Sequence, residues 1–151
     1  MDGISIRQAR TDEAGEIRAL VRAAYAKWVP VIGREPRPML ADYDAAVRLH
    51  RFDLVEVLGQ LVALIETELR DGHLWVENIA VQPERQGNGL GRVLLAHAEG
   101  LAQAAGVSEI RLLTNGKMLA NRRLYASVGY VEDREEPFGD GTVVYLSKRV
   151  G

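Results

Sequence analysis

The chain contains no cysteine, which excludes disulfide bonds, a thiolate nucleophile and cysteine-bound zinc. No apolar run approaches the roughly 20 residues that a membrane helix needs, and the opening MDGISIRQAR lacks the pattern of a secretory signal. Neither sign of charge dominates, since 19 Lys and Arg residues stand against 21 Asp and Glu residues. Without an overall positive field, neither nucleic acid nor a membrane is expected as a partner. These absences favour a cytoplasmic protein.

The composition is otherwise that of an ordinary globular protein. Hydrophobic residues make up 47% of the 151 residues and charged residues 26%. A chain of this length and composition can bury a core of its own. We therefore expect one domain over residues 1–151.

The first half of the sequence predicts a strand, two helices and three more strands. Residues 4–10 alternate between apolar and polar, as a half-buried strand does. A helix is expected over residues 11–28, with Thr11 as its N-cap and Pro30 as its end. A short helix is expected around residues 40–49.

Three strands are then expected over residues 53–58, 61–69 and 74–81. Two-residue turns at Gly59-Gln60 and Asp71-Gly72 would join them into an antiparallel meander.

The second half of the sequence continues with alternating helices and strands. Apolar residues at helical spacing follow the glycines near position 90, and Gly106 is expected just beyond that helix. A strand over 108–114, a helix over 117–129 and two strands over 130–136 and 141–150, joined around Pro137 to Gly141, complete the chain. The order β-α-α-β-β-β-α-β-α-β-β predicts an α/β (α+β) fold with a mixed, mostly antiparallel sheet of about seven strands and about four helices.

Three closely spaced glycines, Gly87, Gly89 and Gly91, precede the apolar helix. Glycine allows the main chain to adopt positive φ and to approach a phosphate, and the first N–H groups of a helix are free to bind one. A dinucleotide fingerprint would need glycine at Arg92, and no Gly-Lys-Ser/Thr of a P-loop occurs. The spacing therefore indicates a different phosphate ligand, the alternative being a tight turn that binds nothing.

These residues carry a family resemblance. The stretch QGNGLG, from Gln86 to Gly91, matches the [Q/R]-x-x-G-x-[G/A] acyl-CoA-binding motif of the GNAT superfamily of N-acetyltransferases. The stretch NRRLYASVGY, residues 121–130, is similar to a second signature of that family. The resemblance extends over essentially the whole chain in element order. It implies a GNAT-like fold that uses acetyl-CoA.

The resemblance also implies which residues bind the co-substrate. Acetyl-CoA would lie between strands 74–81 and 108–114 where they move apart, its pantetheine arm on the main chain of the first strand and its pyrophosphate on the glycine loop. The implied residues are Ile79, Ala80, Val81, Gln86, Gly87, Asn88, Gly89, Leu90, Gly91, Arg92 and Asn121. Arginines at 85, 92, 122 and 123 are further candidates for the phosphates.

Two residues are candidates for proton transfer. By resemblance, Tyr125 would protonate the leaving thiolate, and a phenol keeps its proton at neutral pH; the alternative is a half-buried core aromatic. Glu77, a carboxylate in a mostly apolar strand, is the candidate base that receives the proton of the amine, with an exposed outer-face glutamate as the alternative. Glu66 and Glu68 are expected to face solvent.

The sequence thus predicts an acyl-CoA-dependent N-acyltransferase, which would transfer acetyl to a primary amine by direct attack in a ternary complex. The alternatives are another acyl group or a hydroxyl acceptor, a catalytically inactive CoA-binding sensor, and a nucleotide-binding domain. No metal is expected, because His50, His73 and His97 lack metal-ligand spacing. The mixed charges of residues 28–43 leave the amine acceptor open, and no motif decides for or against a homodimer.

Overall fold

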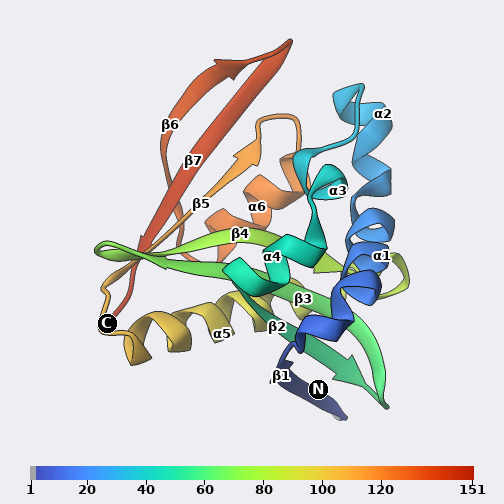
Figure 1. Cartoon of the computed structure of the whole chain (residues 1–151). Coiled ribbons are helices and arrows are strands. Elements are labelled where there is room, and N and C mark those ends of the chain that lie inside the picture. The colour runs from blue at the N-terminus through green and yellow to red at the C-terminus, as the bar shows by residue number, and fades with distance from the viewer. Residues whose placement is uncertain (1–2) are drawn as a thin grey trace.

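A mixed sheet of seven strands forms the body of the protein in the computed structural model, which describes residues 3–151 (Figure 1). The strand order is β1-β2-β3-β4-β5-β7-β6. Only the β4–β5 pair is parallel, and the other neighbours are antiparallel. The strands are β1 (Ile4–Gln8), β2 (Arg51–Val57), β3 (Gln60–Arg70), β4 (His73–Val81), β5 (Glu109–Asn115), β6 (Val131–Phe138) and β7 (Gly141–Arg149). The predicted fold class is confirmed.

Helices cover both faces of the sheet. Leu64 packs in a buried cluster with α1 and α4, while the next residue, Ile65, packs in a second cluster with α5. Successive strand residues point to opposite faces, so α1 and α5 lie on opposite sides. The helical segments are η1 (Thr11–Glu13), α1 (Ala14–Tyr25), η2 (Ala26–Trp28), α2 (Val29–Ile32), α3 (Arg37–Leu40), α4 (Tyr43–Leu49), η3 (Pro83–Arg85), α5 (Leu90–Ala104) and α6 (Leu119–Ser127). No helix within residues 3–151 has the length and apolarity that crossing a membrane requires.

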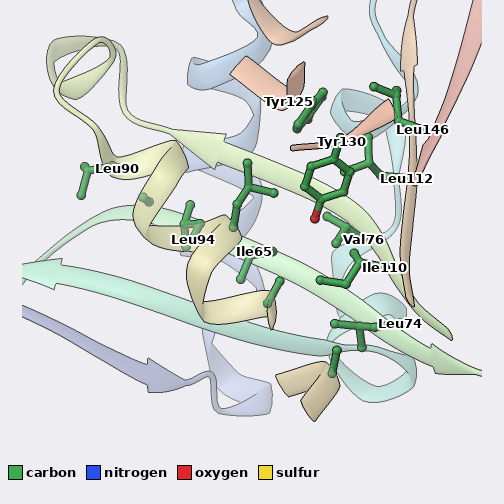
Figure 2. Close-up of a cluster of buried hydrophobic side chains, with 14 of the residues drawn as sticks. Ile65, Leu74, Val76, Leu90, Leu94, Ile110, Leu112, Tyr125, Tyr130 and Leu146 are labelled. Carbon is green, nitrogen blue, oxygen red and sulfur yellow. The ribbon is translucent and has the colours of Figure 1, made fainter. Parts of the chain in front are cut away.

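The second cluster holds α5 and α6 against the strands (Figure 2). Leu90 and Leu94 of α5 belong to one cluster with Ile65 and Val76 of the sheet, and all four are buried. Tyr125 of α6 belongs to the same cluster. This packing fixes the N-terminus of α5 beside the end of β4.

The first helical region differs from the prediction at both ends. Thr11 is not the N-cap but the first residue of η1, which follows Arg10. Pro30 does not end the helix, because it lies in the first turn of α2, where the N–H that proline lacks would have no partner anyway. Helical structure continues to Ile32 and stops at Gly33, whose φ is +88°.

The helix expected around residues 40–49 is interrupted. Leu40 ends α3, and α4 begins at Tyr43 after Asp42, whose side chain accepts a hydrogen bond from the Ala45 N–H at 3.2 Å. Aspartate is a favoured N-cap, which explains why the chain restarts a helix here.

Two of the three strand connections differ from the prediction. The first hairpin turn is Leu58-Gly59, one residue earlier than expected, with φ of +52° and +80°. The Asp71-Gly72 turn is confirmed. Pro137 belongs to β6 itself, since an edge strand tolerates a missing N–H, and the chain turns between Phe138 and Gly141.

A partly buried ion pair ties β1 to η1. The Arg7 guanidinium donates to both carboxylate oxygens of Glu13, at 2.8 and 2.6 Å, and Glu13 is only 3% exposed. These hydrogen bonds lower the pKa of Glu13 from 4.5 to about 2. The folded state therefore gains stability from the ionised carboxylate above pH 4.5, and loses it as the pH falls toward 2.

Glu13→Gln is expected to lower the free energy of unfolding by about 2 kcal/mol at pH 7. Because the wild-type advantage depends on ionised Glu13, the difference should shrink as the pH falls below 4. Urea unfolding at pH 7 and pH 3 measures both values. Asp12→Asn, which alters an exposed pair with Arg10, is the control and should change stability little. A constant difference at the two pH values would contradict the linkage.

Candidate active site

The site begins where β4 and β5 separate. Their parallel pairing extends over Leu74–Val76 and Ile110–Leu112 only. Beyond Val76, the paired partner of β4 is β3, which follows β4 as far as Val81. Figure 1 shows β5 and the β6–β7 hairpin turning away from β4. The second half of β4 is thereby left with one unpaired edge.

A cleft of about 320 Å³ lies along this edge. Its walls come from the C-terminal part of α1 with η2, the end of β4, the loop before α5, the first turn of α5, and α6. The lining residues are Ala24, Tyr25, Lys27, Trp28, Ile79, Val81, Arg85, Gln86, Gly87, Gly89, Leu90, Gly91, Arg92, Ala120, Asn121, Leu124 and Tyr125. Both signature stretches of the sequence therefore contribute to one cavity.

The main chain of β4 alternates in direction along this edge. The N–H of Gln82, the residue after β4, donates to the carbonyl of Val62 in β3 at 2.8 Å. In an antiparallel pair the residues point their main-chain groups alternately toward and away from the partner. Ala80 thus directs its N–H and C=O to β3, and its side chain is buried on the α1 side. Ile79 and Val81 direct theirs into the cleft.

The three glycines serve different purposes. Gly87 and Gly89 have φ of +82° and +87°, a region that only glycine adopts without strain. Gly91 has ordinary helical geometry, but a Cβ there would lie 2.9 Å from a methyl group of Leu124. Two glycines therefore shape the loop, and the third lets α5 approach α6. The first N–H groups of α5, from Leu90 on, begin at the cleft wall.

The Gln86 side chain is engaged by the protein itself. Its Nε2 donates to the carbonyls of Val81, at 2.8 Å, and Ala24, at 3.3 Å, while its Oε1 accepts from Lys27 Nζ at 2.7 Å. Cationic groups at the cleft come from Lys27, Arg85 and Arg92. Arg122, by contrast, pairs with Glu132 and does not line the cleft, and neither does Arg123.

Two side chains of α6 enter the cleft one turn apart. Asn121 is half-buried and donates through Nδ2 to the sulfur of Met118 at 3.5 Å. Tyr125 is 7% exposed, and its ring centroid lies 5.9 Å from that of Tyr130. Burial raises the pKa of Tyr125 to about 12, so the phenol stays protonated at any physiological pH.

Three of the residues that the sequence predicts for the site do not line the cleft. They are Ala80, which faces β3, the exposed Asn88, and Glu77. Glu77 is the extra residue of a β-bulge, because Val76 pairs with Thr67 and Asn78 with Glu66. Its carboxylate is exposed and accepts a hydrogen bond from Trp75 Nε1 at 2.6 Å.

The expectation that Glu66 faces solvent is wrong. Glu66 is 4% exposed, with Oε2 at 2.6 Å from Nδ1 of His50, whose Nε2 lies 3.2 Å from Glu68. Burial raises the pKa of Glu66. Burial alone would lower the pKa of His50, but the neighbouring Glu66 more than offsets this, and the pKa is raised. Within residues 3–151, no group of three or more His, Cys, Asp or Glu side chains is arranged to hold a metal ion.

The sequence prediction missed the wall formed by Tyr25, Lys27 and Trp28. Tyr25 fits the apolar face of the first helix and therefore gives the same signal as a core residue. The Tyr25 hydroxyl lies 2.9 Å from Asn78 Oδ1 and 3.0 Å from the Ile79 carbonyl. Only the packing of α1 over the end of β4 reveals this contact.

Comparison with known proteins agrees with this geometry. The family model described as the acetyltransferase (GNAT) family matches residues 17–130, which is most of the chain. The chain therefore belongs to the GNAT acetyltransferase family. A search of curated proteins found no match.

Solved structures show the same fold at low sequence identity. The ribosomal-protein-S18-alanine N-acetyltransferase from Escherichia coli has a TM-score of 0.79 at 21% identity, covering 98% of this chain and 94% of that one. A PaiA N-acetyltransferase from Thermoplasma acidophilum, solved in complex with coenzyme A, has a TM-score of 0.82 at 16% identity. The match covers 97% of this chain and 98% of that one. A GNAT family acetyltransferase from Elizabethkingia anophelis with acetyl-CoA bound has a TM-score of 0.74 at 14% identity. The match covers 99% of this chain and 100% of that one.

Proposed function

We propose that the protein transfers an acetyl group from acetyl-CoA to a primary amine in a ternary complex. The observation that carries this proposal is the convergence on one cleft of the open β4 edge, the start of α5 and Tyr125. These are, in order, donors for an extended polar arm, donors for a phosphate, and a protonated phenol. An enzyme that binds a nucleotide alone would need neither the open β4 edge nor the protonated phenol of Tyr125.

The residues of the cleft fit acetyl-CoA. The N–H groups of Ile79 and Val81 point into it, and the glycine loop leads into free N–H groups of α5. Lys27, Arg85 and Arg92 add positive charge along the same wall. Together they would hold the pantetheine arm and the phosphates, and acetyl-CoA supplies an acetyl group activated as a thioester.

Tyr125 would act on the sulfur of the thioester. When the amine nitrogen bonds to the acetyl carbon and the carbon–sulfur bond breaks, negative charge develops on sulfur. The Tyr125 hydroxyl, kept protonated by burial, would donate a hydrogen bond and then a proton to it. Burial strengthens this interaction because little water competes in the cleft.

We propose Glu77 as the group that receives the amine proton. Because its carboxylate is exposed and lies outside the cleft lining, the proton would reach it through a water molecule. Glu77→Gln is expected to lower kcat about tenfold near pH 7, because the amide cannot accept a proton. Glu68→Gln, on the neighbouring strand, is the matched control. If both variants keep the wild-type pH–rate profile, Glu77 has no such role.

The function as a whole is tested with purified protein, acetyl-CoA and a panel of primary amines, amino acids, peptides, aminoglycosides and hydroxyl compounds. Release of free thiol is followed, and acetylated products are identified by mass spectrometry. Thiol release that depends on an amine supports the proposal. Binding of CoA without thiol release for any acceptor would favour a CoA sensor. Competition by ATP or NAD but not by CoA would favour a nucleotide-binding domain.

A further inference from the structure

We propose that Tyr25 and Gln86 are positioning residues that turn the open edge of β4 into an edge with free donors only. Such an edge binds a ligand arm through that ligand's carbonyl oxygens. The inference rests on the proposed function and adds to it how this chain orients the co-substrate.

An unpaired strand edge ordinarily offers donors and acceptors in equal number. Here Ile79 and Val81 each direct one N–H and one C=O toward the cleft. A ligand with both amide N–H and C=O groups could therefore lie along a bare edge in more than one register or direction. Something must select one.

Both cleft-facing carbonyls already have a side-chain donor. The Tyr25 hydroxyl reaches the Ile79 carbonyl at 3.0 Å, and Gln86 Nε2 reaches the Val81 carbonyl at 2.8 Å. These two side chains come from α1 and from the glycine loop, and they take the place that β5 would hold in a continuous sheet. A ligand N–H would have to share each carbonyl with a donor that is already bound.

Both donors are themselves held in place. Gln86 is fixed by Ala24 and Lys27, and the single Tyr25 proton is shared between two acceptors, Asn78 Oδ1 at 2.9 Å and the Ile79 carbonyl at 3.0 Å. The free groups that remain on this edge are the N–H groups of Ile79 and Val81, about 6.6 Å apart at the rise of a β-strand. The pantetheine arm of CoA carries two amide carbonyls that can accept from such donors. Tyr25 and Gln86 would thus fix its direction before it binds.

Residue-resolved amide hydrogen exchange tests the edge directly. On addition of CoA, exchange of the Ile79 and Val81 amides is expected to slow at least tenfold, whereas the Ala80 amide, bonded to β3, should change far less. Unchanged exchange at both residues, with binding heat still seen by calorimetry, overturns this inference while leaving the proposed function intact. Absence of any CoA binding overturns both.

Variants test the two side chains. Tyr25→Phe and Gln86→Leu are each expected to raise the dissociation constant of CoA about fivefold and KM for acetyl-CoA in parallel, with kcat changed less. Gln86→Glu, which keeps the shape but lacks the Nε2 donor, should behave like Gln86→Leu. Tyr43→Phe is the control, because its hydroxyl bonds to the Pro38 carbonyl and the Asn78 side chain in the same polar cluster but not to the main chain of Ile79 or Val81. Wild-type CoA affinity in Tyr25→Phe and Gln86→Leu would rule out the positioning role.

Discussion

Tyr125→Phe is expected to lower kcat about 100-fold, with KM for acetyl-CoA changed less than threefold. The substitution removes the hydroxyl but keeps the ring that packs against Tyr130 and α5. Without the proton donor, the thiolate must leave as an anion in a cleft that solvates it poorly, which raises the barrier of the step that breaks the carbon–sulfur bond. Steady-state kinetics of thiol release give both constants.

Tyr130→Phe is the matched control for that experiment. Tyr130 lies beside Tyr125 and is 4% exposed, yet it does not line the cleft, and its hydroxyl has no hydrogen-bond partner within residues 3–151. Removing a buried unpaired hydroxyl should leave kcat within about twofold and stability equal or higher. If Tyr125→Phe retained full kcat, Tyr125 would be a packing residue only.

Gly89→Val is expected to weaken CoA binding about 100-fold, measured as the dissociation constant by calorimetry. Gly89 has φ of +87° immediately before α5, and a β-branched residue is strained in that region. The loop must therefore change conformation, and the N–H groups at the start of α5 would no longer converge on one phosphate. The loss should appear in binding first and in kcat only secondarily.

Gly100→Val provides the control for Gly89→Val. Gly100 lies within α5, a Cβ there meets nothing within 4 Å, and its φ is not positive. Its CoA affinity should match the wild type, and thermal unfolding should show both variants folded. Unchanged affinity in Gly89→Val would mean that the loop does not bind the phosphates through its main chain.

Local sequence patterns predicted most elements correctly because they report local preferences. The alternation of apolar and polar residues correctly predicted β1. Gly106 and Gly129 lie just beyond the ends of α5 and α6, and both have the positive φ that is typical of glycine at the C-terminus of a helix. The errors at Pro30 and Pro137 have one cause. The missing N–H of proline destabilises a structure only where that N–H would have a hydrogen-bond partner. The first turn of a helix, where Pro30 lies, and the edge of a sheet, where Pro137 lies, provide no such partner.

The site was predictable only in part. The glycine loop and α6 carry short motifs whose chemistry is local, so the sequence indicated Gly87, Gly89, Asn121 and Tyr125 as residues of one site. Nothing local distinguishes Tyr25 from the core residues of its helix. Nor does alternation along β3 reveal that Glu66 is buried beside His50, because His50 lies sixteen positions earlier, between α4 and β2.

The sequence alone determined the element order, the glycine loop and the family, because each depends on neighbours along the chain. Tertiary structure decided that β4 and β5 pair for three residues and then separate. It also decided which side chains donate hydrogen bonds to the carbonyls of the β4 edge that this separation leaves unpaired. Those outcomes depend on how α1 packs over the end of β4 and the glycine loop: Tyr25 lies 54 positions from Ile79 in the sequence, and Gln86 lies 62 positions from Ala24. Whether a main-chain group is free to bind a ligand is a property of that packing.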